Sequence, residues 1–202
     1  QRGEDRGIVR KFVERAWRRP ITELELDRFM ALLEDAIARG DSYLDAYKFV
    51  MKAAMVSPHF LFLAEPEPPE IGLYSLGDFP LAARMSYFLW GTMPDEELFA
   101  AAREGKLQND DELRYQIRRM LADPKARGLG ELFAAQWLGI TQLGETIRLD
   151  ENRFPDFDAD LVASMRGEAA AFFTHIVQED RSLLELIDAN YTFLDESLAR
   201  VY

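Results

Sequence analysis

Hydrophobic residues recur along most of the chain at the spacing that places them on one face of an α-helix. In the first predicted helix these positions are Ile8, Val9, Phe12, Val13, Ala16 and Trp17. Pro20 ends this helix, because proline lacks the N–H that the helical hydrogen-bond ladder needs. Thr22 and Glu25 have the spacing of a capping box, which predicts that a second helix begins there. It ends at Gly40, and a third helix follows and ends before Pro58.

The helical spacing continues through the second half of the chain. It predicts helices over residues 78–90, 94–105, 109–123, 124–139, 159–179 and 182–189. Residues 140–157 form the longest irregular stretch, and we find no set of alternating segments that could build a sheet. The sequence therefore predicts an all-α fold of about eight to nine helices in two packed modules, with no significant sheet.

A proline-rich segment separates the two predicted modules. Residues 64–73 read AEPEPPEIGL, which favours a stiff, extended linker rather than a helix or a strand. We therefore predict a three-helix module over residues 1–63 and a second helical module over residues 74–202.

Acidic residues dominate the second half of the chain. The 202 residues include 24 Lys and Arg and 36 Asp and Glu, which gives a formal net charge of −12. Residues 1–66 carry 11 acids and 11 bases, whereas residues 67–202 carry 25 acids and 13 bases. Such a surface repels nucleic acid and anionic membranes, and it favours cations or the basic faces of proteins. No apolar run has the roughly 18 residues that a membrane-spanning helix needs.

The residue inventory leaves little material for catalysis or cofactor binding. The chain has no cysteine and only two histidines, which excludes disulfides, cysteine-ligated metals and covalent haem attachment within this stretch. It also lacks the phosphate-binding loop, the dinucleotide fingerprint, the serine nucleophile elbow and the paired-histidine zinc motif. We expect no cofactor in this stretch, and the residues alone reveal no reaction for it.

Three side chains in the long predicted helix over residues 159–179 are the only candidates for a metal site. His175 and Glu179 are four residues apart, and Glu168 lies two turns before His175, so the three share about one face. A metal site in a helical bundle needs ligands from a second helix, and the sequence supplies no matching pair. An ordinary surface histidine is the alternative to a metal ligand or a general base at this position.

Other polar and aromatic positions have structural explanations. Asp156, Asp158 and Asp160 resemble the start of a calcium loop but lack its later glycine and glutamate, so Asp158 is interpreted as a helix cap. His59 follows a helix end, where its ring is expected to bond to a carbonyl oxygen. Each tryptophan lies on an apolar helical face, which favours packing in the core over an exposed platform for sugars. These tryptophans are Trp17, Trp90 and Trp137.

Several segments together resemble one pair of families. Residues 12–22 (FVERAWRRPIT) and 56–62 (VSPHFLF) resemble domain-of-unknown-function family 1595, and residues 76–202 are similar to family 1592. The second likeness is carried by residues 81–90 (LAARMSYFLW), 93–98 (MPDEEL), 119–124 (RMLADP), 133–138 (FAAQWL), 179–182 (EDRS) and 188–194 (DANYTFL). This chain has Asp195 where the second family usually has Asn, and Val201 where His is common before Tyr202.

The resemblance implies a context rather than a reaction. These paired domains resemble the central part of large exported proteins of planctomycete-type bacteria, which commonly also carry a c-type cytochrome module. The resemblance therefore implies an exported or periplasmic location, haem c only in a separate module, and other domains of the same polypeptide as partners. No catalytic residues are established for the family, so none is transferred to this chain.

Both ends of the sequence favour a piece of a longer polypeptide. The chain begins at Gln1 without a methionine or the apolar stretch of a signal peptide, and it ends at Tyr202 within a helical pattern. Two functions stay open. One is a non-catalytic helical scaffold that docks a c-type cytochrome or another redox partner through its acidic surface. The other is part of a carboxylate-based enzyme, or a binding module, that acts on extracellular polysaccharide.

Overall fold

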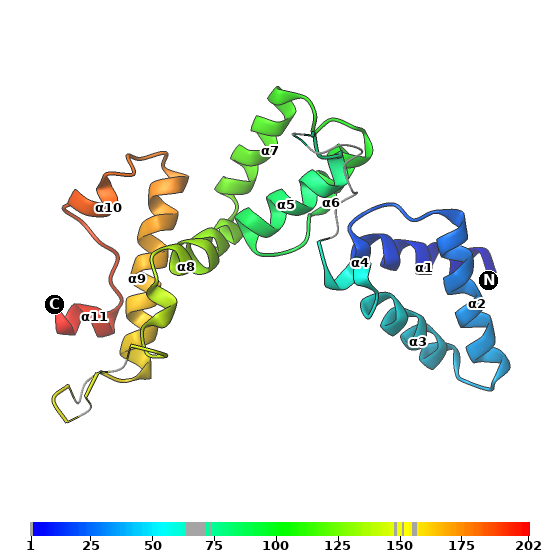
Figure 1. Ribbon diagram of the computed structural model, residues 1–202, viewed down its shortest axis with the longest axis horizontal. Helices are drawn as coiled ribbons and strands as arrows, with labels where there is room; N and C mark the ends of the chain where they lie inside the picture. Colours follow the sequence, from blue (N-terminus) through cyan, green and yellow to red (C-terminus); the bar gives the residue numbers. More distant parts are fainter. Residues whose placement is uncertain (1, 64–71, 73, 148, 151, 155–156) are drawn as a thin grey trace. The chain divides into compact units, whose positions relative to one another are not determined.

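The fold is all-α, as predicted. A computed structural model describes residues 2–63, 72, 74–147, 149–150, 152–154 and 157–202. Within these residues there are 11 α-helices and no strand (Figure 1). Of the linker predicted at residues 64–73, only Gly72 is described, so that prediction lies outside the described residues. None of the described helices is long and apolar enough to cross a bilayer.

Contacts between residues divide the chain into two compact units. Unit 1 consists of Gln1–Arg84 and Pro94–Gln108, and unit 2 consists of Met85–Met93 and Asn109–Tyr202. The division falls inside one helix, because α5 (Asp78–Trp90) contributes its first part to unit 1 and its last part to unit 2. The predicted domain boundary at residues 64–73 stays a prediction.

Unit 1 is built around three helices that all contact one another. Besides the first part of α5, it contains α1 (Arg2–Trp17), α2 (Glu23–Ala38), α3 (Tyr43–Met55), α4 (Pro58–Leu61) and α6 (Glu96–Arg103). Helices α1, α2 and α3 contact one another pairwise, and their apolar faces form one core. The core residues are Val9, Val13, Ile21, Leu26, Phe29, Met30, Leu33, Ala36, Ala46, Val50 and Ala54. Burial of these side chains is the main stabilising contribution in this part of the fold.

The predicted helix ends of unit 1 are confirmed. The Thr22 hydroxyl accepts a hydrogen bond from the Glu25 backbone N–H at 3.2 Å, and the Glu25 carboxylate accepts one from the Thr22 backbone N–H at 2.8 Å. This reciprocal pair is the capping box that the spacing predicted. Gly40 has a φ of 98°, the left-handed conformation in which glycine is favoured after a helix.

Unit 2 contains the longest helix of the described chain and several short segments. After the last part of α5 come α7 (Asp110–Ala122), the 3₁₀ turn η1 (Pro124–Ala126), the π-helical segment η2 (Leu129–Ala134), α8 (Ala135–Trp137) and the 3₁₀ turn η3 (Ile140–Gln142). They are followed by α9 (Ala159–Gln178), α10 (Glu185–Asp188) and α11 (Glu196–Val201). Segment η2 packs mainly on α9, and the two form the most extensive contact between elements of unit 2.

A π-helical segment replaces part of the single helix predicted over residues 124–139. Two glycines explain its close packing. A Cβ atom on Gly128 would lie 2.6 Å from the Trp90 carbonyl oxygen, and one on Gly130 would lie 2.4 Å from the Ala170 carbonyl oxygen. No side chain fits at either position, so the backbone of this segment lies directly against α5 and α9. A π-helix has more residues per turn than an α-helix, which changes the direction of the side chains that follow.

Some apolar positions at helical spacing face outward. Ile8 lies on the apolar face predicted for the first helix but is 50% exposed, and Leu44 and Phe88 are 64% and 54% exposed. In α9, Phe173 is buried, whereas its neighbour Phe172 is only partly buried. Each of these helices has an apolar stripe wide enough to offer two faces, and the neighbouring elements decide which face is covered.

Candidate functional site

The three candidate metal ligands lie on α9 or at its end, where Glu168 and His175 make separate structural contacts. The Glu168 carboxylate accepts hydrogen bonds from the hydroxyls of Thr192, at 2.6 Å, and Tyr202, at 3.0 Å. Glu179 is the residue that ends α9. Among the described residues there is no group of three or more His, Asp or Glu side chains that could hold a metal ion.

His175 lies in a cluster of aromatic rings. Its ring centroid is 5.6 Å from that of Tyr191 and 5.0 Å from that of Phe193, and Phe172 contacts the same two rings. Tyr191 in turn donates a hydrogen bond to Glu185. The cluster thereby holds the segment after α10 against α9, and His175 takes part in packing this segment.

Charged groups reinforce this attachment. Arg181 Nε donates to the Glu185 carboxylate at 2.7 Å, and this bond and the one from Tyr191 hold the pKa of Glu185 below its usual value. The same carboxylate raises the pKa of the Tyr191 phenol. Asp195 caps α11 by accepting a hydrogen bond from the Leu198 backbone N–H at 2.9 Å, which accounts for an acidic residue at this position.

The two other predicted polar positions differ in outcome. Asp158 caps α9 and accepts a hydrogen bond from the Leu161 backbone N–H at 2.8 Å, as expected. Asp156 lies outside the described residues. The expected bond from the His59 ring to a carbonyl is absent from the described part of the chain. The ring instead lies against Trp17, with centroids 4.6 Å apart, because α4 turns His59 back toward the end of α1.

The three tryptophans have three different environments. Trp90 is buried, and its indole N–H donates to the Met120 carbonyl oxygen at 2.8 Å. Trp17 is half-buried and donates to the Ala54 carbonyl oxygen at 3.1 Å. Trp137 is 60% exposed, so the prediction that it packs in the core is wrong. Trp137 follows the π-helical segment η2, which changes side-chain directions relative to the regular helix that the prediction assumed.

Trp137 belongs to an exposed group of apolar side chains that we call the aromatic surface. Its members are Phe88, Leu132, Phe133, Trp137 and Leu138, all between 40% and 60% exposed. The Phe133 ring is 5.3 Å from that of Phe88 and 6.1 Å from that of Trp137, with an angle of 15° between the last two. The three rings thus form one continuous patch drawn from α5, η2 and α8.

The aromatic surface is supported from behind by α9. Phe173 is only 5% exposed, and its ring lies 6.2 Å from that of Phe133 and 6.3 Å from that of Trp137. Gly130 brings the backbone of η2 directly against α9. The exposed rings therefore pack on tightly packed residues of η2 and α9, which fixes their positions before any partner binds.

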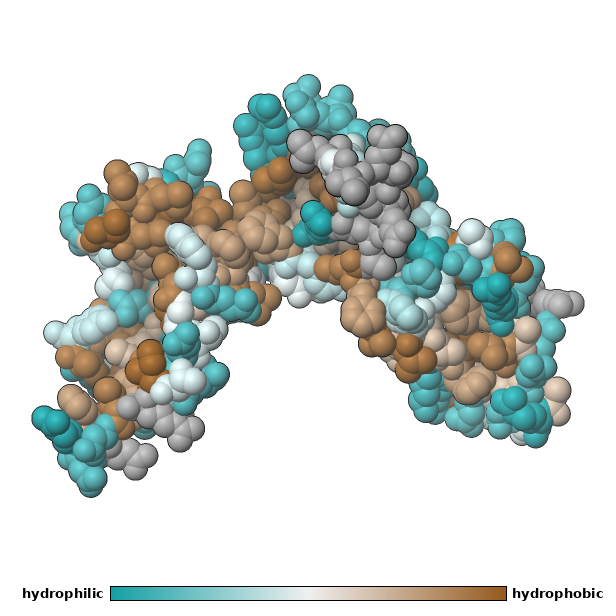
Figure 2. Space-filling view, viewed as in Figure 1, coloured by the Kyte–Doolittle hydropathy of each residue, from teal (hydrophilic) through white to brown (hydrophobic). Residues whose placement is uncertain are grey.

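A second group of exposed apolar side chains lies on α10 and just before it. Leu183, Leu184 and Ile187 are 64%, 67% and 87% exposed. Figure 2 shows hydrophobic surface, in brown, over the part of unit 2 that contains α8 and α10. Soluble proteins rarely expose so many large apolar side chains together unless these meet another surface.

A cleft of about 770 Å³ lies beside α9, and it contains the carboxylates that an enzyme of the alternative class would need. Glu131, Glu145 and Asp158 all line it. Glu131 accepts a hydrogen bond from Arg127 Nε at 2.9 Å, Glu145 pairs with Arg166 at 3.4 Å, and Asp158 caps α9. Each carboxylate thus already has a structural partner.

The sequence contains one signal for the aromatic surface that the prediction did not use. Gly128 and Gly130 are two residues apart inside an otherwise helical apolar stretch. Glycine is unfavourable within a helix, so a pair of them indicates close backbone packing and a local departure from the α-helix. If residues 124–139 are instead treated as one regular α-helix, Phe133 and Trp137 fall on its apolar face, which is then expected to be buried.

The structure thus defines an all-α protein of two units whose second unit presents an ordered aromatic surface. Residues 76–202 match a family described as protein of unknown function (DUF1592), also called PSD4, and residues 5–65 match protein of unknown function (DUF1595), also called PSD5. The chain belongs to the DUF1592 family and carries a DUF1595 segment ahead of it. No curated protein and no solved structure matches the chain.

Proposed function

We propose that this chain is a non-catalytic helical scaffold within a larger exported protein, and that unit 2 docks the basic face of a c-type cytochrome. The observation that carries the proposal is the aromatic surface of Phe88, Leu132, Phe133, Trp137 and Leu138, exposed yet packed on a buried base. The family likeness supplies the cytochrome as the partner to test first.

The composition of the aromatic surface supports a protein partner. Aromatic side chains dominate the central contacts of protein interfaces, and a few such residues supply most of the binding free energy. Trp137 and Phe133 bring large apolar areas with little conformational entropy to lose, because Phe173 already holds their rings from behind. Leu132 and Leu138 extend the apolar area around them.

The charge of the chain supports a basic partner. Residues 67–202 carry 25 acids and 13 bases, and these residues include all of unit 2. Opposite charges on two proteins raise the rate of their encounter and fix their orientation, while apolar contacts hold the complex once it has formed. The affinity of unit 2 for such a partner should therefore fall as salt screens its acidic residues. It should also depend on the apolar contacts that Trp137 makes with the partner.

One observation favours the second candidate, a binding module for extracellular polysaccharide. The rings of Phe133 and Trp137 are only 15° from parallel, an arrangement that suits stacking on sugar rings. Within the described residues the Trp137 indole N–H has no hydrogen-bond partner, so it is available to a sugar hydroxyl. The carboxylate-based enzyme has less support, because the carboxylates in the cleft beside α9 already have structural partners.

Calorimetric titration of the chain with a basic c-type cytochrome at low and high salt tests the proposal. We expect binding at low salt that weakens markedly at high salt. Absence of binding at both salt concentrations would overturn the cytochrome-docking proposal. A parallel titration with soluble polysaccharide separates the second candidate, because neutral sugars would bind equally well at both salt concentrations.

A further inference from the structure

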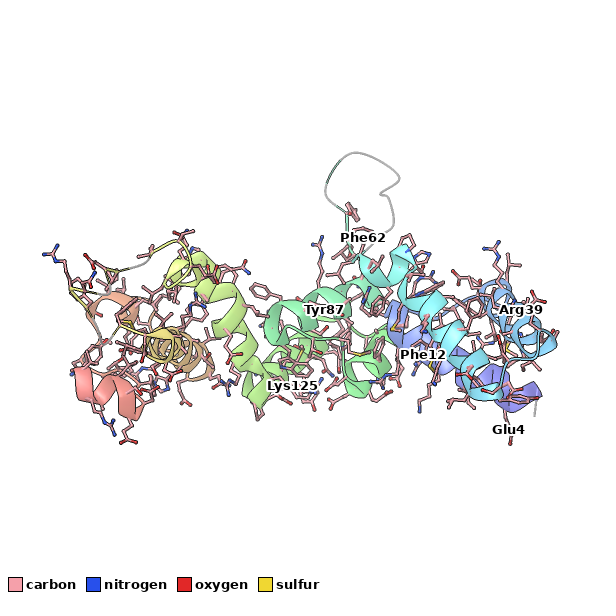
Figure 3. The ribbon with its side chains drawn as sticks, turned by 90° about the horizontal axis from the view of Figure 1, so that it is seen from below. Glu4, Phe12, Arg39, Phe62, Tyr87 and Lys125 are labelled. Carbon is pink, nitrogen blue, oxygen red and sulfur yellow. The ribbon has the colours of Figure 1, made fainter. Side chains whose placement is uncertain are left out.

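Unit 1 exposes a run of apolar side chains along α3 and α4. Val56, Leu61 and Phe62 are 70%, 59% and 65% exposed, and Phe49 on α3 is 42% exposed. In Figure 3 the labelled Phe62 side chain stands out from the chain just after α4. Large apolar side chains gathered in this way on a soluble protein indicate contact with another surface.

This part of unit 1 is basic, in contrast to the chain as a whole. Residues 46–63 contain two lysines, one histidine and no acidic residue, although the formal net charge of the chain is −12. Lys52 lies three residues after Phe49 and four before Val56, so these side chains share one face of α3. The basic apolar surface, as we call it, consists of Phe49, Lys52, Val56, Leu61 and Phe62.

Lys52 supplies the available positive charge of this surface. The other lysine of the stretch, Lys48, pairs with Asp45 at 3.4 Å, and the Ser42 hydroxyl donates to the same carboxylate at 2.6 Å. Lys52 is exposed and forms no ion pair within the part of the chain that the structure describes. Its charge is therefore available to a group on another molecule.

Unit 2 exposes a surface of the opposite charge at α10. The acidic apolar surface, as we call it, consists of Leu183, Leu184 and Ile187 together with Glu179, Asp180 and Asp188. Ile187 is 87% exposed. The three acids are exposed and form no ion pair with any described residue, whereas Glu185 between them pairs with Arg181 at 2.7 Å. This surface thus combines large apolar side chains with available negative charge.

The two surfaces are alike in their apolar groups and opposite in charge. Either surface paired with its own copy would bring like charges into one interface, which is unfavourable. Contact between the two surfaces buries apolar side chains together and brings Lys52 to a surface that carries unpaired acids. We propose that copies of this chain associate with one another, with the basic apolar surface of one copy against the acidic apolar surface of another. No residue of the aromatic surface takes part, so this proposal is independent of the proposed function.

Analytical ultracentrifugation of the 202-residue chain at increasing concentration tests the association. We expect a mean mass above that of one chain, which rises with chain concentration. High salt should lower this mass, because salt screens the charges that the two surfaces bring together. A mass that stays at that of one chain up to about 500 µM would overturn the proposal.

Two variants test whether both surfaces are needed. Leu61→Glu places an acid on the basic apolar surface, and Ile187→Lys places a base on the acidic apolar surface. Each variant alone should associate at least about tenfold more weakly than the parent chain, because every contact needs both surfaces. A mixture of the two should associate again, since each variant keeps the surface that the other has lost. A mixture that stays monomeric, or a loss of association in only one of the two variants, would contradict the proposal.

Two matched controls locate the effect. Leu24 in unit 1 and Phe154 in unit 2 are 63% and 50% exposed apolar residues outside the two surfaces. Leu24→Glu and Phe154→Lys should associate like the parent chain, and an equally large loss in either would contradict the location. Association in the mixture also shows that both variants fold. If either variant does not fold, Val56→Glu or Leu184→Lys replaces it on the same surface.

Discussion

The α carbon of Gly130 lies so close to the main-chain carbonyl of Ala170 that a Cβ atom at residue 130 would come within 2.4 Å of that oxygen. The same Cβ would also lie 2.5 Å from the Thr174 hydroxyl, which itself donates to the Ala170 carbonyl at 2.7 Å. This contact between η2 and α9 carries the aromatic surface on its outer side. The stability of unit 2 and the position of Trp137 therefore depend on a residue that has no side chain.

Gly130→Ala should lower the free energy of unfolding by about 2–3 kcal/mol, because the added methyl group meets backbone that cannot move away easily. Gly167→Ala is the matched control on α9. A Cβ at residue 167 has no neighbour within 4 Å, so alanine should stabilise this exposed helical position by about 0.5–1 kcal/mol. Urea denaturation of both variants measures the two effects. Equal behaviour of the two variants would contradict the close packing of η2 on α9.

Glu25 should make the chain sensitive to acid. Hydrogen bonds from Arg19, at 2.7 Å, and from the Thr22 backbone hold the pKa of Glu25 at about 2, against an ordinary value of 4.5. Because the folded pKa is depressed, this stabilisation is present above about pH 4.5 and is lost as the pH falls toward 2. Glu25→Gln keeps the capping-box spacing but loses the ion pair. Glu25→Gln should lower the free energy of unfolding by on the order of 2 kcal/mol near neutral pH. The difference in this free energy between the variant and the parent chain should shrink below pH 4.

Tyr47 should respond at the opposite end of the pH range. Partial burial and a hydrogen bond that its hydroxyl donates to Asp5, at 2.6 Å, raise the pKa of Tyr47 to about 12. A raised folded pKa means that the stabilisation is present below about pH 10 and is lost as the pH rises toward 12. Tyr47→Phe should therefore lower the free energy of unfolding by about 1 kcal/mol at neutral pH, and by less above pH 10. A cost that stays constant through this alkaline range would contradict the assignment.

Features set by neighbouring residues were predictable from the sequence. The capping box of Thr22 and Glu25, the left-handed Gly40 and the cap at Asp158 all depend on side chains within a few residues of the backbone groups that they satisfy. Local hydrogen bonding leaves few alternatives at such positions. The all-α fold class follows from the same short-range pattern, repeated along the chain.

Features set by distant residues were not predictable in this way. Phe88 and Trp137 lie on apolar faces in sequence, yet both are exposed. Gly128 and Gly130 bring the backbone around η2 against Trp90 and Ala170, which lie far away along the chain. The ring cluster around His175 likewise depends on residues 16 and 18 positions further along the chain. A periodic pattern shows which residues share a face, but not whether another element covers it.

The affinity of Trp137→Ala for a basic c-type cytochrome, measured by calorimetry at low salt, tests the central claim most directly. Phe154→Ala is the matched control, since Phe154 is a 50% exposed aromatic residue of unit 2 outside the aromatic surface. The docking proposal predicts that Trp137→Ala loses about tenfold or more in affinity while Phe154→Ala stays close to the parent chain. Equal affinity of the two variants and the parent chain would contradict the claim that the aromatic surface holds the partner.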